Sequence, residues 1–387
     1  MKSGYDRWLL TSVSALLMVG LLMVASASMV ISDRQYGYPF HYLLHQTLYL
    51  SLGVALAWVM TRIPLSVLQK VSGYLLLVSL LLLVLVLIPG IGKMVNGSRR
   101  WIHIGWLSIQ VSEIAKLCSI VYLASYLQRY QEFIRHELRR FLKPMLLLAL
   151  LAALLLLEPD FGAVAVITVT FLLLLFIAGV RLWPFFILFL LVIVALSSLA
   201  IIAPYRLERL TTFLNPWHTP FSSGYQLTQS LMAFGRGGLW GVGLGNSVQK
   251  LFYLPEAHTD FLFAVLAEEW GLVGTFLVIS LFAVMVARIF SVGWRAEKSG
   301  NEFAAYVAYG FALWIGLQSM INMGVNVGLL PTKGLTLPLV SYGGSSLLMN
   351  CILVGIVLRI SYENSMNMVQ RRFRVHGVAS RPSSWVS

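Results

Sequence analysis

Long uninterrupted apolar segments dominate this sequence of 387 residues. Apolar residues make up 58% of the chain and charged residues 11%, whereas a soluble domain has about half and about a quarter. A helix needs about 20 mostly apolar residues to cross a bilayer. The pattern therefore predicts an integral membrane protein and excludes a soluble enzyme, a disordered scaffold and a disulfide-stabilised domain.

Ten segments are apolar enough to be spans, so we expect an all-α integral membrane protein with about ten transmembrane helices in one domain, residues 1–387. The fifth segment is short because Glu158, Pro159 and Asp160 interrupt it. A large outer loop, 204–260, follows the seventh, and 362–387 form a tail. The expected spans are 8–32, 43–61, 71–89, 109–127, 145–157, 161–180, 183–203, 261–288, 303–324 and 346–361.

The positions of lysine and arginine predict the orientation of the spans. Most of the 28 basic residues lie in alternate connections on the side of both termini, so we expect both termini in the cytoplasm. The net charge of +13 is scattered, which favours membrane orientation over nucleic-acid binding. Cys118 and Cys351 lie in apolar segments without a CxxC pair, as expected of core residues.

The outer loop is rich in glycine, particularly over 235–245. No predicted strand precedes this stretch and the G-x-G-x-x-G spacing is absent, so we expect close backbone packing rather than phosphate binding. The loop also contains several aromatic residues, which argues against disorder and predicts that it folds over the outer end of the bundle.

Ionisable residues are costly inside a membrane and are candidates for function. Glu113 and Lys116 are three residues apart and share a helix face, where a self-compensating ion pair is the structural alternative. Glu268 and Glu269 either extend the site or pair internally. The other candidates lie where outer turns meet the spans, at one expected membrane level: Arg99, Arg100, Glu158, Asp160, Glu256, His258 and Asp260.

These residue types favour carboxylate chemistry at the outer leaflet. A partly desolvated carboxylate has a raised pKa and acts as a base near neutral pH, and nearby cations bind phosphate. No G-x-S-x-G or H-E-x-x-H motif is present. An enzyme acting on a lipid-linked phosphorylated substrate and a transporter of one both fit, whereas a structural scaffold leaves the charges unexplained.

Several longer strings resemble the SEDS family (shape, elongation, division and sporulation). The resemblance covers nearly the whole chain, and the run Gly224–Ser230 is similar to the division branch rather than the elongation branch. The strings are NPW at 215–217, GYQLTQSLMAFG at 224–235, LPEAHTDF at 254–261, PTKGLTLP at 331–338 and SYGGSS at 341–346.

The resemblance implies a peptidoglycan glycosyltransferase that polymerises lipid II on the outer face of the bacterial inner membrane, at the division septum. Asp260 matches the family's essential aspartate, and Arg100, Lys116 and Asp160 match polar positions of its central cavity. Mg²⁺ or Mn²⁺ is expected with no organic cofactor, and its ligands stay unassigned. Val111 stands where the family usually has proline, and Glu158 where it usually has glutamine.

The expected reaction is inverting glycosyl transfer with an undecaprenyl-pyrophosphate leaving group. Asp260 would be the general base, Arg100 and Lys116 would neutralise the pyrophosphate, and Glu256 and His258 complete the substrate-binding candidates. The alternative is a lipid II flippase, which predicts ionisable residues through the whole depth of the bundle.

The resemblance also implies a class B penicillin-binding protein as the transpeptidase partner, together with other division proteins. Small-residue faces let helices approach closely. We therefore expect this partner at spans eight and nine, through Gly271 and Gly274 or Gly310 and Gly316.

Overall fold

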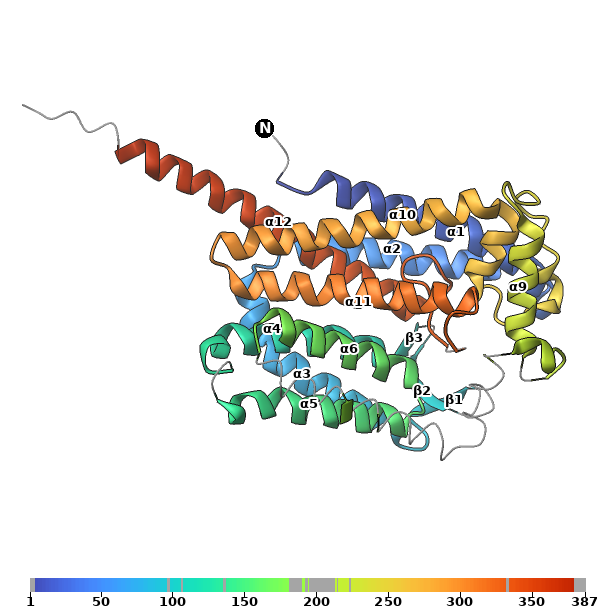
Figure 1. Ribbon diagram of the computed structural model, residues 1–387, viewed down its shortest axis with the longest axis horizontal. Helices are drawn as coiled ribbons and strands as arrows, with labels where there is room; N and C mark the ends of the chain where they lie inside the picture. The colour runs from blue at the N-terminus through green and yellow to red at the C-terminus, as the bar shows by residue number, and fades with distance from the viewer. Residues whose placement is uncertain are drawn as a thin grey trace, which may run out of the picture.

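The computed structural model describes residues 4–95, 98–105, 107–134, 137–180, 215–222, 224–331 and 334–378, with a few isolated positions between 181 and 214. The chain is mostly helical, and its long helices run side by side in one bundle (Figure 1). The seventh expected span, 183–203, and the first part of the outer loop lie outside the described residues.

The described part of the chain confirms a polytopic helical membrane fold. Seven of its helices (α1, α2, α3, α5, α10, α11 and α12) are long and apolar enough to cross a membrane, and α6 is a shorter apolar helix. Helix α4 contains Glu113 and Lys116 and is largely buried between its neighbours. The bounds are α1 Arg7–Tyr36, α2 His41–Arg62, α3 Leu65–Leu87, α4 Val111–Ile134, α5 Leu138–Leu157, α6 Phe161–Ile177, α10 Leu262–Lys298, α11 Glu302–Asn326 and α12 Gly344–Val378.

Between α3 and α4, the described part of the chain adds to the expected helical fold a feature that was not predicted. Three short strands, β1 (Gly92–Val95), β2 (Ser98–Ile104) and β3 (Leu107–Gln110), form an antiparallel sheet in that order. Ser345 Oγ at the start of α12 accepts from the Gln110 N–H at 2.8 Å and donates to the Ser108 carbonyl at 2.7 Å. The sheet is thereby fixed to the bundle, and α4 begins directly after it.

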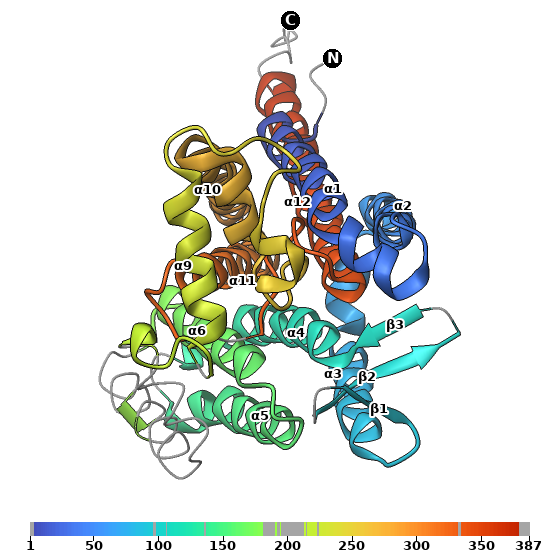
Figure 2. The same cartoon turned by 90° about the vertical axis from the view of Figure 1, so that its right-hand side faces the viewer.

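The described part of the outer loop folds onto the end of the bundle. It contains η1 (Pro216–His218), α9 (Tyr225–Gly237) and η2 (Gln249–Tyr253), and α9 crosses this end against α10 (Figures 1 and 2). A Cβ at Gly237 would lie 2.0 Å from the Ala267 carbonyl oxygen, and one at Gly241 2.1 Å from that of Glu269. The prediction of close backbone packing in the glycine-rich stretch is confirmed.

Two of the glycines expected to contact a partner are instead used inside the chain. Gly271 interrupts α10 with φ +66°, and a Cβ there would lie 2.4 Å from the Gly241 nitrogen. A Cβ at Gly310 would lie 2.4 Å from Cγ2 of Ile120. These positions are glycine because the chain packs against itself there, so the assignment of Gly271 and Gly310 to a partner surface is corrected.

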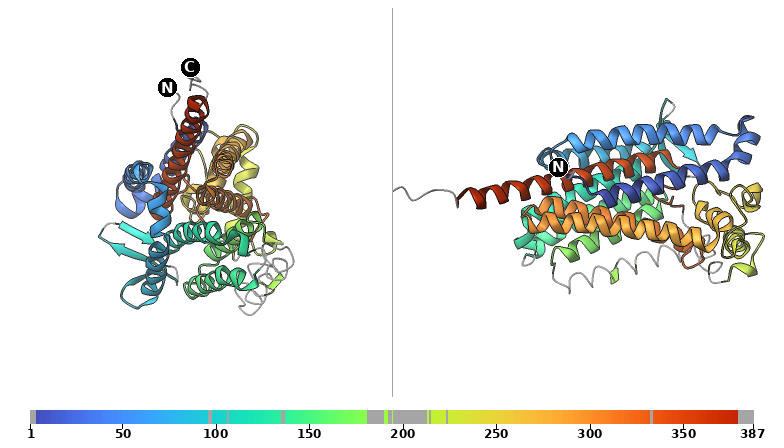
Figure 3. Two further views of the ribbon diagram at one scale, coloured as in Figure 1. Left: turned by 90° about the vertical axis from the view of Figure 1, so that its left-hand side faces the viewer. Right: turned by 90° about the horizontal axis from the view of Figure 1, so that it is seen from above.

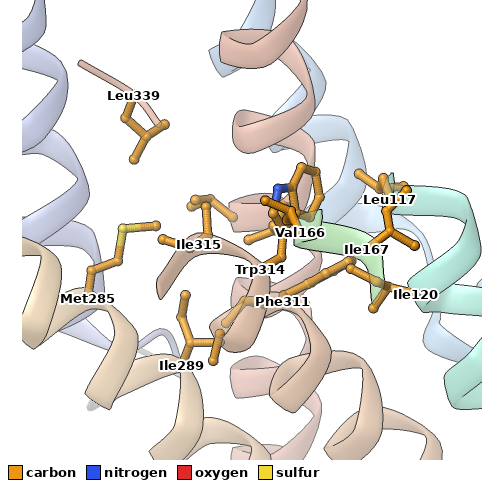
Figure 4. Packing of buried hydrophobic residues seen from close by; sticks show 14 of the residues in the cluster. Leu117, Ile120, Val166, Ile167, Met285, Ile289, Phe311, Trp314, Ile315 and Leu339 are labelled. Carbon is orange, nitrogen blue, oxygen red and sulfur yellow. The ribbon is translucent and has the colours of Figure 1, made fainter. Parts of the chain in front are cut away.

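The apolar core extends through the bundle, and a central part of it lies where α4, α6, α10 and α11 meet (Figure 4). Phe311 and Trp314 of α11 are fully buried, with Ile120 and Ile167 on one side and Met285 and Ile289 on the other. At one end of the bundle, Tyr5 stacks on Tyr362 with ring centroids 5.5 Å apart. The beginning of α1 and the later part of α12 therefore lie together, opposite the sheet and α9 (Figures 1 and 3).

Candidate active site

Asp260 lies in the turn that leads from the outer loop into α10. Its backbone carbonyl accepts hydrogen bonds from the side-chain amides of Asn322 at 2.9 Å and Asn326 at 3.0 Å. On the other side is Gly334, where a Cβ would lie 3.3 Å from Oδ2 of Asp260. Helix α11 and the last outer loop therefore fix the position of Asp260 from two directions.

A row of amides on α11, Gln318, Asn322 and Asn326, connects the candidate residues. Spacing by four places them on one helix face. Asn322 also donates to the Leu335 carbonyl at 2.6 Å, and Gln318 to the Thr336 carbonyl at 3.0 Å. We did not predict these residues as site members, although amides at this spacing in an apolar span were a signal in the sequence.

Lys116 lies close to the same row. Its Nζ is 2.7 Å from Glu113 Oε1 and 2.7 Å from Gln318 Oε1, and it lies 4.9 Å from the centre of the Trp314 ring. The lysine is almost fully buried. The structure thus forms the ion pair that the sequence left as the structural alternative, and Gln318 joins this pair to the loop beside Asp260.

Arg100 of β2 binds the turn between α5 and α6. Its Nε donates to the Glu158 carbonyl at 3.0 Å, and Nη2 donates to the Pro159 carbonyl at 2.6 Å. Asp160 ends this turn, where Oδ1 accepts from the Ala163 N–H at 3.2 Å and caps α6. Oδ2 of Asp160 accepts from the Gln110 side chain at 3.3 Å. The unexpected sheet therefore brings Arg100 to the two residues before Asp160, and Gln110 to Asp160 itself.

Charged groups of these turns change the pKa values of the two buried acids Asp260 and Glu158. Burial and the negative charges of Glu256 and Asp160 raise the pKa of Asp260 to about 7, against the opposing effect of Arg100. Burial and Asp160 raise the pKa of Glu158 to about 8, again opposed by Arg100. Glu158 is fully buried, and neither carboxylate oxygen has a hydrogen-bond partner. Both acids therefore titrate near neutral pH.

The remaining two candidates flank Asp260. Glu256 is exposed and accepts from the Thr259 hydroxyl at 2.7 Å. The His258 carbonyl accepts from the Tyr342 N–H at 3.0 Å. The centroid of the His258 ring lies 4.7 Å from the centroid of the Tyr42 ring. Burial lowers the pKa of His258, against the opposing effect of the Glu256 charge. The structure thus brings Arg100, Asp160, Glu256, His258 and Asp260 to one end of the bundle.

Glu268 and Glu269 bind the outer loop rather than extend this site. Glu268 accepts from Arg236 at 3.0 Å and from the Val248 N–H at 3.0 Å. Glu269 accepts from Lys250 at 2.8 Å and from the Ser26 hydroxyl of α1 at 2.6 Å. Both glutamates are buried. The question that the sequence left open is settled in favour of internal pairing.

The described residues do not form a metal centre of their own. Nowhere in that part of the chain do three His, Cys, Asp or Glu side chains gather in a way that could hold an ion. Mg²⁺ commonly binds one or two carboxylates, waters and substrate phosphates. The described side chains therefore do not fit a cation held by protein ligands alone.

The fold and the site define a polytopic membrane protein with a carboxylate centre at one end of its helical bundle. The sequence profile of FtsW, RodA and SpoVE, described as "Cell cycle protein", matches residues 7–366. This chain therefore belongs to the FtsW/RodA/SpoVE family, which confirms the resemblance to SEDS proteins.

Individual relatives agree with this assignment. Two relatives are described as "Probable peptidoglycan glycosyltransferase FtsW". The protein from Coxiella burnetii is 66% identical over 93% of this chain and 97% of its own length. The protein from Legionella pneumophila is 54% identical over 94% of this chain and 92% of its own length. Similarity to FtsW proteins over this length confirms the predicted division branch.

Solved structures show the same fold. One is a chain from work described as "Structural coordination of polymerization and crosslinking by a peptidoglycan synthase complex", with a TM-score of 0.77 and 30% identity over 93% of this chain and 98% of that chain. The rod shape determining protein RodA of Thermus thermophilus has a TM-score of 0.69 and 29% identity, over 93% and 97%.

Proposed function

We propose that this chain is a peptidoglycan glycosyltransferase that polymerises lipid II during division, with Asp260 as its general base. The observation that carries the proposal is the position of Asp260, a carboxylate fixed through its backbone by α11 and surrounded by groups that raise its pKa to about 7. A general base is most effective when its pKa lies near the working pH. The names of the FtsW relatives support the same reaction.

In the proposed reaction, the Asp260 carboxylate removes the proton from the 4-hydroxyl of the acceptor sugar. That oxygen attacks the anomeric carbon of the donor sugar with inversion, while the bond from this carbon to the pyrophosphate oxygen breaks. Undecaprenyl pyrophosphate leaves with the bonding electron pair. Arg100 and Lys116 are proposed to bind the anionic leaving group, and Asp160, Glu256 and His258 to bind the substrate.

The decisive experiment compares Asp260→Asn with the wild type on purified lipid II in detergent. One positioned base contributes about 10²–10⁴-fold to the rate, so the variant should lose glycan synthesis by that factor. Asp33→Asn, which changes an exposed carboxylate at the outer end of α1, is the matched control and should remain active. A fully active Asp260→Asn protein would remove this residue from the role, and glycan ladders from the wild type cannot arise from a flippase.

The pH dependence provides a second test. Since the base must be deprotonated to accept the proton, kcat/KM should rise as the pH increases through about 7, the pKa of Asp260. A rate that is flat from pH 6 to pH 8 would contradict the assignment of this titration to the catalytic step.

We further propose that the protein lies in the inner membrane at the septum, with both termini in the cytoplasm. A divalent cation is proposed to be carried with the substrate pyrophosphate.

The proposed partner is a class B penicillin-binding protein, among other division proteins. The solved relative from a complex that coordinates polymerization and crosslinking supports such a partner. For its contact we propose the exposed apolar face of α10 formed by Leu272, Val273, Phe276 and Leu277.

The partner surface is tested by Phe276→Ala, which removes a ring that is 62% exposed. Co-purification with the transpeptidase should fall, whereas Tyr74→Ala, which removes an exposed ring on α3, should leave it unchanged. Equal co-purification of both variants would move the interface away from this face.

A further inference from the structure

Six rings form a continuous cluster that leads from the Asp260 turn to the outer ends of α1 and α2. His258 and Tyr342 belong to the two outer loops beside the site. The other four rings lie at the end of α1 (Tyr36) and at the start of α2 (His41, Tyr42 and His45). Ring centroids are 4.7 Å apart for His258 and Tyr42, 5.1 Å for Tyr42 and Tyr342, 5.9 Å for Tyr42 and Tyr36, 3.8 Å for Tyr36 and His41, and 4.4 Å for His41 and His45.

The α1–α2 connection, which joins the two helices that carry these rings, is held in a fixed shape. The buried Ser32 hydroxyl donates to the Tyr38 carbonyl at 2.7 Å and accepts from the His41 N–H at 3.1 Å. Farther along α2, the buried Gln46 donates to the Ser341 carbonyl at 3.3 Å, directly before Tyr342. The rings of α2 are therefore fixed relative to the loop that contacts His258.

Among the six rings, the side chain of Tyr36 is 53% exposed and the other five are half-buried. A molecule leaving the Asp260 turn in this direction would meet ring faces bordered by hydroxyl and imidazole edges. Such faces suit a pyranose, which has apolar C–H faces and a polar rim, better than a pyrophosphate, which requires cations.

We propose that this ring cluster (Tyr36, His41, Tyr42, His45, His258 and Tyr342) binds the saccharide of the glycan strand adjoining the reacting sugar. The inference rests on the proposed function and adds a carbohydrate subsite to it. The other reading is an aromatic belt at the membrane surface, in which each ring sits separately among lipid headgroups. The continuous link from Tyr36 through Tyr42 to His258, beside the Asp260 turn, favours the subsite.

Binding can be measured without catalysis by titrating chitotetraose, a soluble tetrasaccharide of N-acetylglucosamine, into the Asp260→Asn protein in detergent. Each lost ring contact should weaken binding about threefold to tenfold in Tyr36→Ala and Tyr42→Ala. Tyr36→Phe keeps the ring and should retain the affinity. Trp58→Ala, which removes a 60% exposed ring lower on α2, is the matched control for a belt residue and should bind normally.

Product length gives a second readout in the protein that retains Asp260. Strands made from lipid II by Tyr36→Ala should be shorter by at least about twofold, because this subsite would no longer hold the strand between additions. Tyr36 is exposed at the end of α1, so this variant tests the proposal even if Tyr42→Ala does not fold.

The outcomes separate the two proposals. Loss of saccharide binding in the alanine variants supports the subsite even if the Asp260 assignment fails. No binding to the parent protein, or equal binding by Tyr36→Ala and Trp58→Ala, overturns the subsite while leaving the glycosyltransferase proposal intact. A Tyr36→Ala protein that differs from its parent only in affinity for lipid vesicles would identify a membrane belt and also overturn the subsite.

Discussion

Glu158 provides a quantitative prediction because it is fully buried with two unpartnered oxygens. Burial and Asp160 raise its pKa from 4.5 to about 8. The folded state therefore holds this proton more tightly than the unfolded state, so the contribution of Glu158 to stability is largest below pH 4.5 and falls as the pH rises towards 8. The full difference corresponds to about 5 kcal/mol, of which about 3 kcal/mol is lost by pH 7.

Glu158→Gln keeps the shape of the side chain but removes the titration. The variant should match the wild type within about 1 kcal/mol at pH 5 and exceed it by about 3 kcal/mol at pH 7, with the gap still growing at pH 8. Thermal unfolding in detergent across this pH range measures the difference. Glu137→Gln, at a half-exposed glutamate paired with Arg140, should show no such trend. Parallel curves for Glu158→Gln and the wild type would refute the argument.

Three further changes test how the site is held together. Lys250→Met or Glu269→Gln alone should cost about 3–5 kcal/mol by leaving a buried charge unpaired, and the double variant should recover most of it in an unfolding cycle. Asn322→Ala should lower stability by about 2–3 kcal/mol and slow glycan synthesis, because the carbonyl of Asp260 loses one of its donors. Gly310→Leu should reduce folded yield in size-exclusion chromatography before any partner is added, since the new side chain overlaps Ile120.

Hydropathy was sufficient to predict most of the fold, because lipid requires every spanning backbone to satisfy its own hydrogen bonds. The convergence of Arg100, Asp160 and Asp260 was also predictable, since alternating spans bring outer turns to one membrane level. The small sheet was not predictable in this way. Its strands have four to seven residues, too few for a clear alternation of polar and apolar residues.

Residues that act through contacts with a distant part of the backbone could not be predicted either, because the sequence does not show which distant segments meet. Asn322 and Asn326 hold the Asp260 carbonyl, a contact between positions about 60 residues apart in sequence. Gly271 and Gly310 are small because other parts of the chain pass close to them, and a sequence of small residues does not say whether the neighbour belongs to the same chain or to a partner.

The distribution of buried charge bears on the choice between polymerisation and transport. In the described helices, the buried Glu113, Lys116, Glu268 and Glu269 lie towards the end that carries the sheet and α9. At the other end, Asp6, which directly precedes α1, forms ion pairs with Arg288 and Arg295 of α10. Between them is the apolar layer around Phe311 (Figure 4), which Lys116 borders at the ring of Trp314. A pyrophosphate crossing that layer would lose its hydration without a compensating charge, which is expensive in a medium of low dielectric constant. A reaction confined to the outer end has no such cost, so the arrangement favours a polymerase.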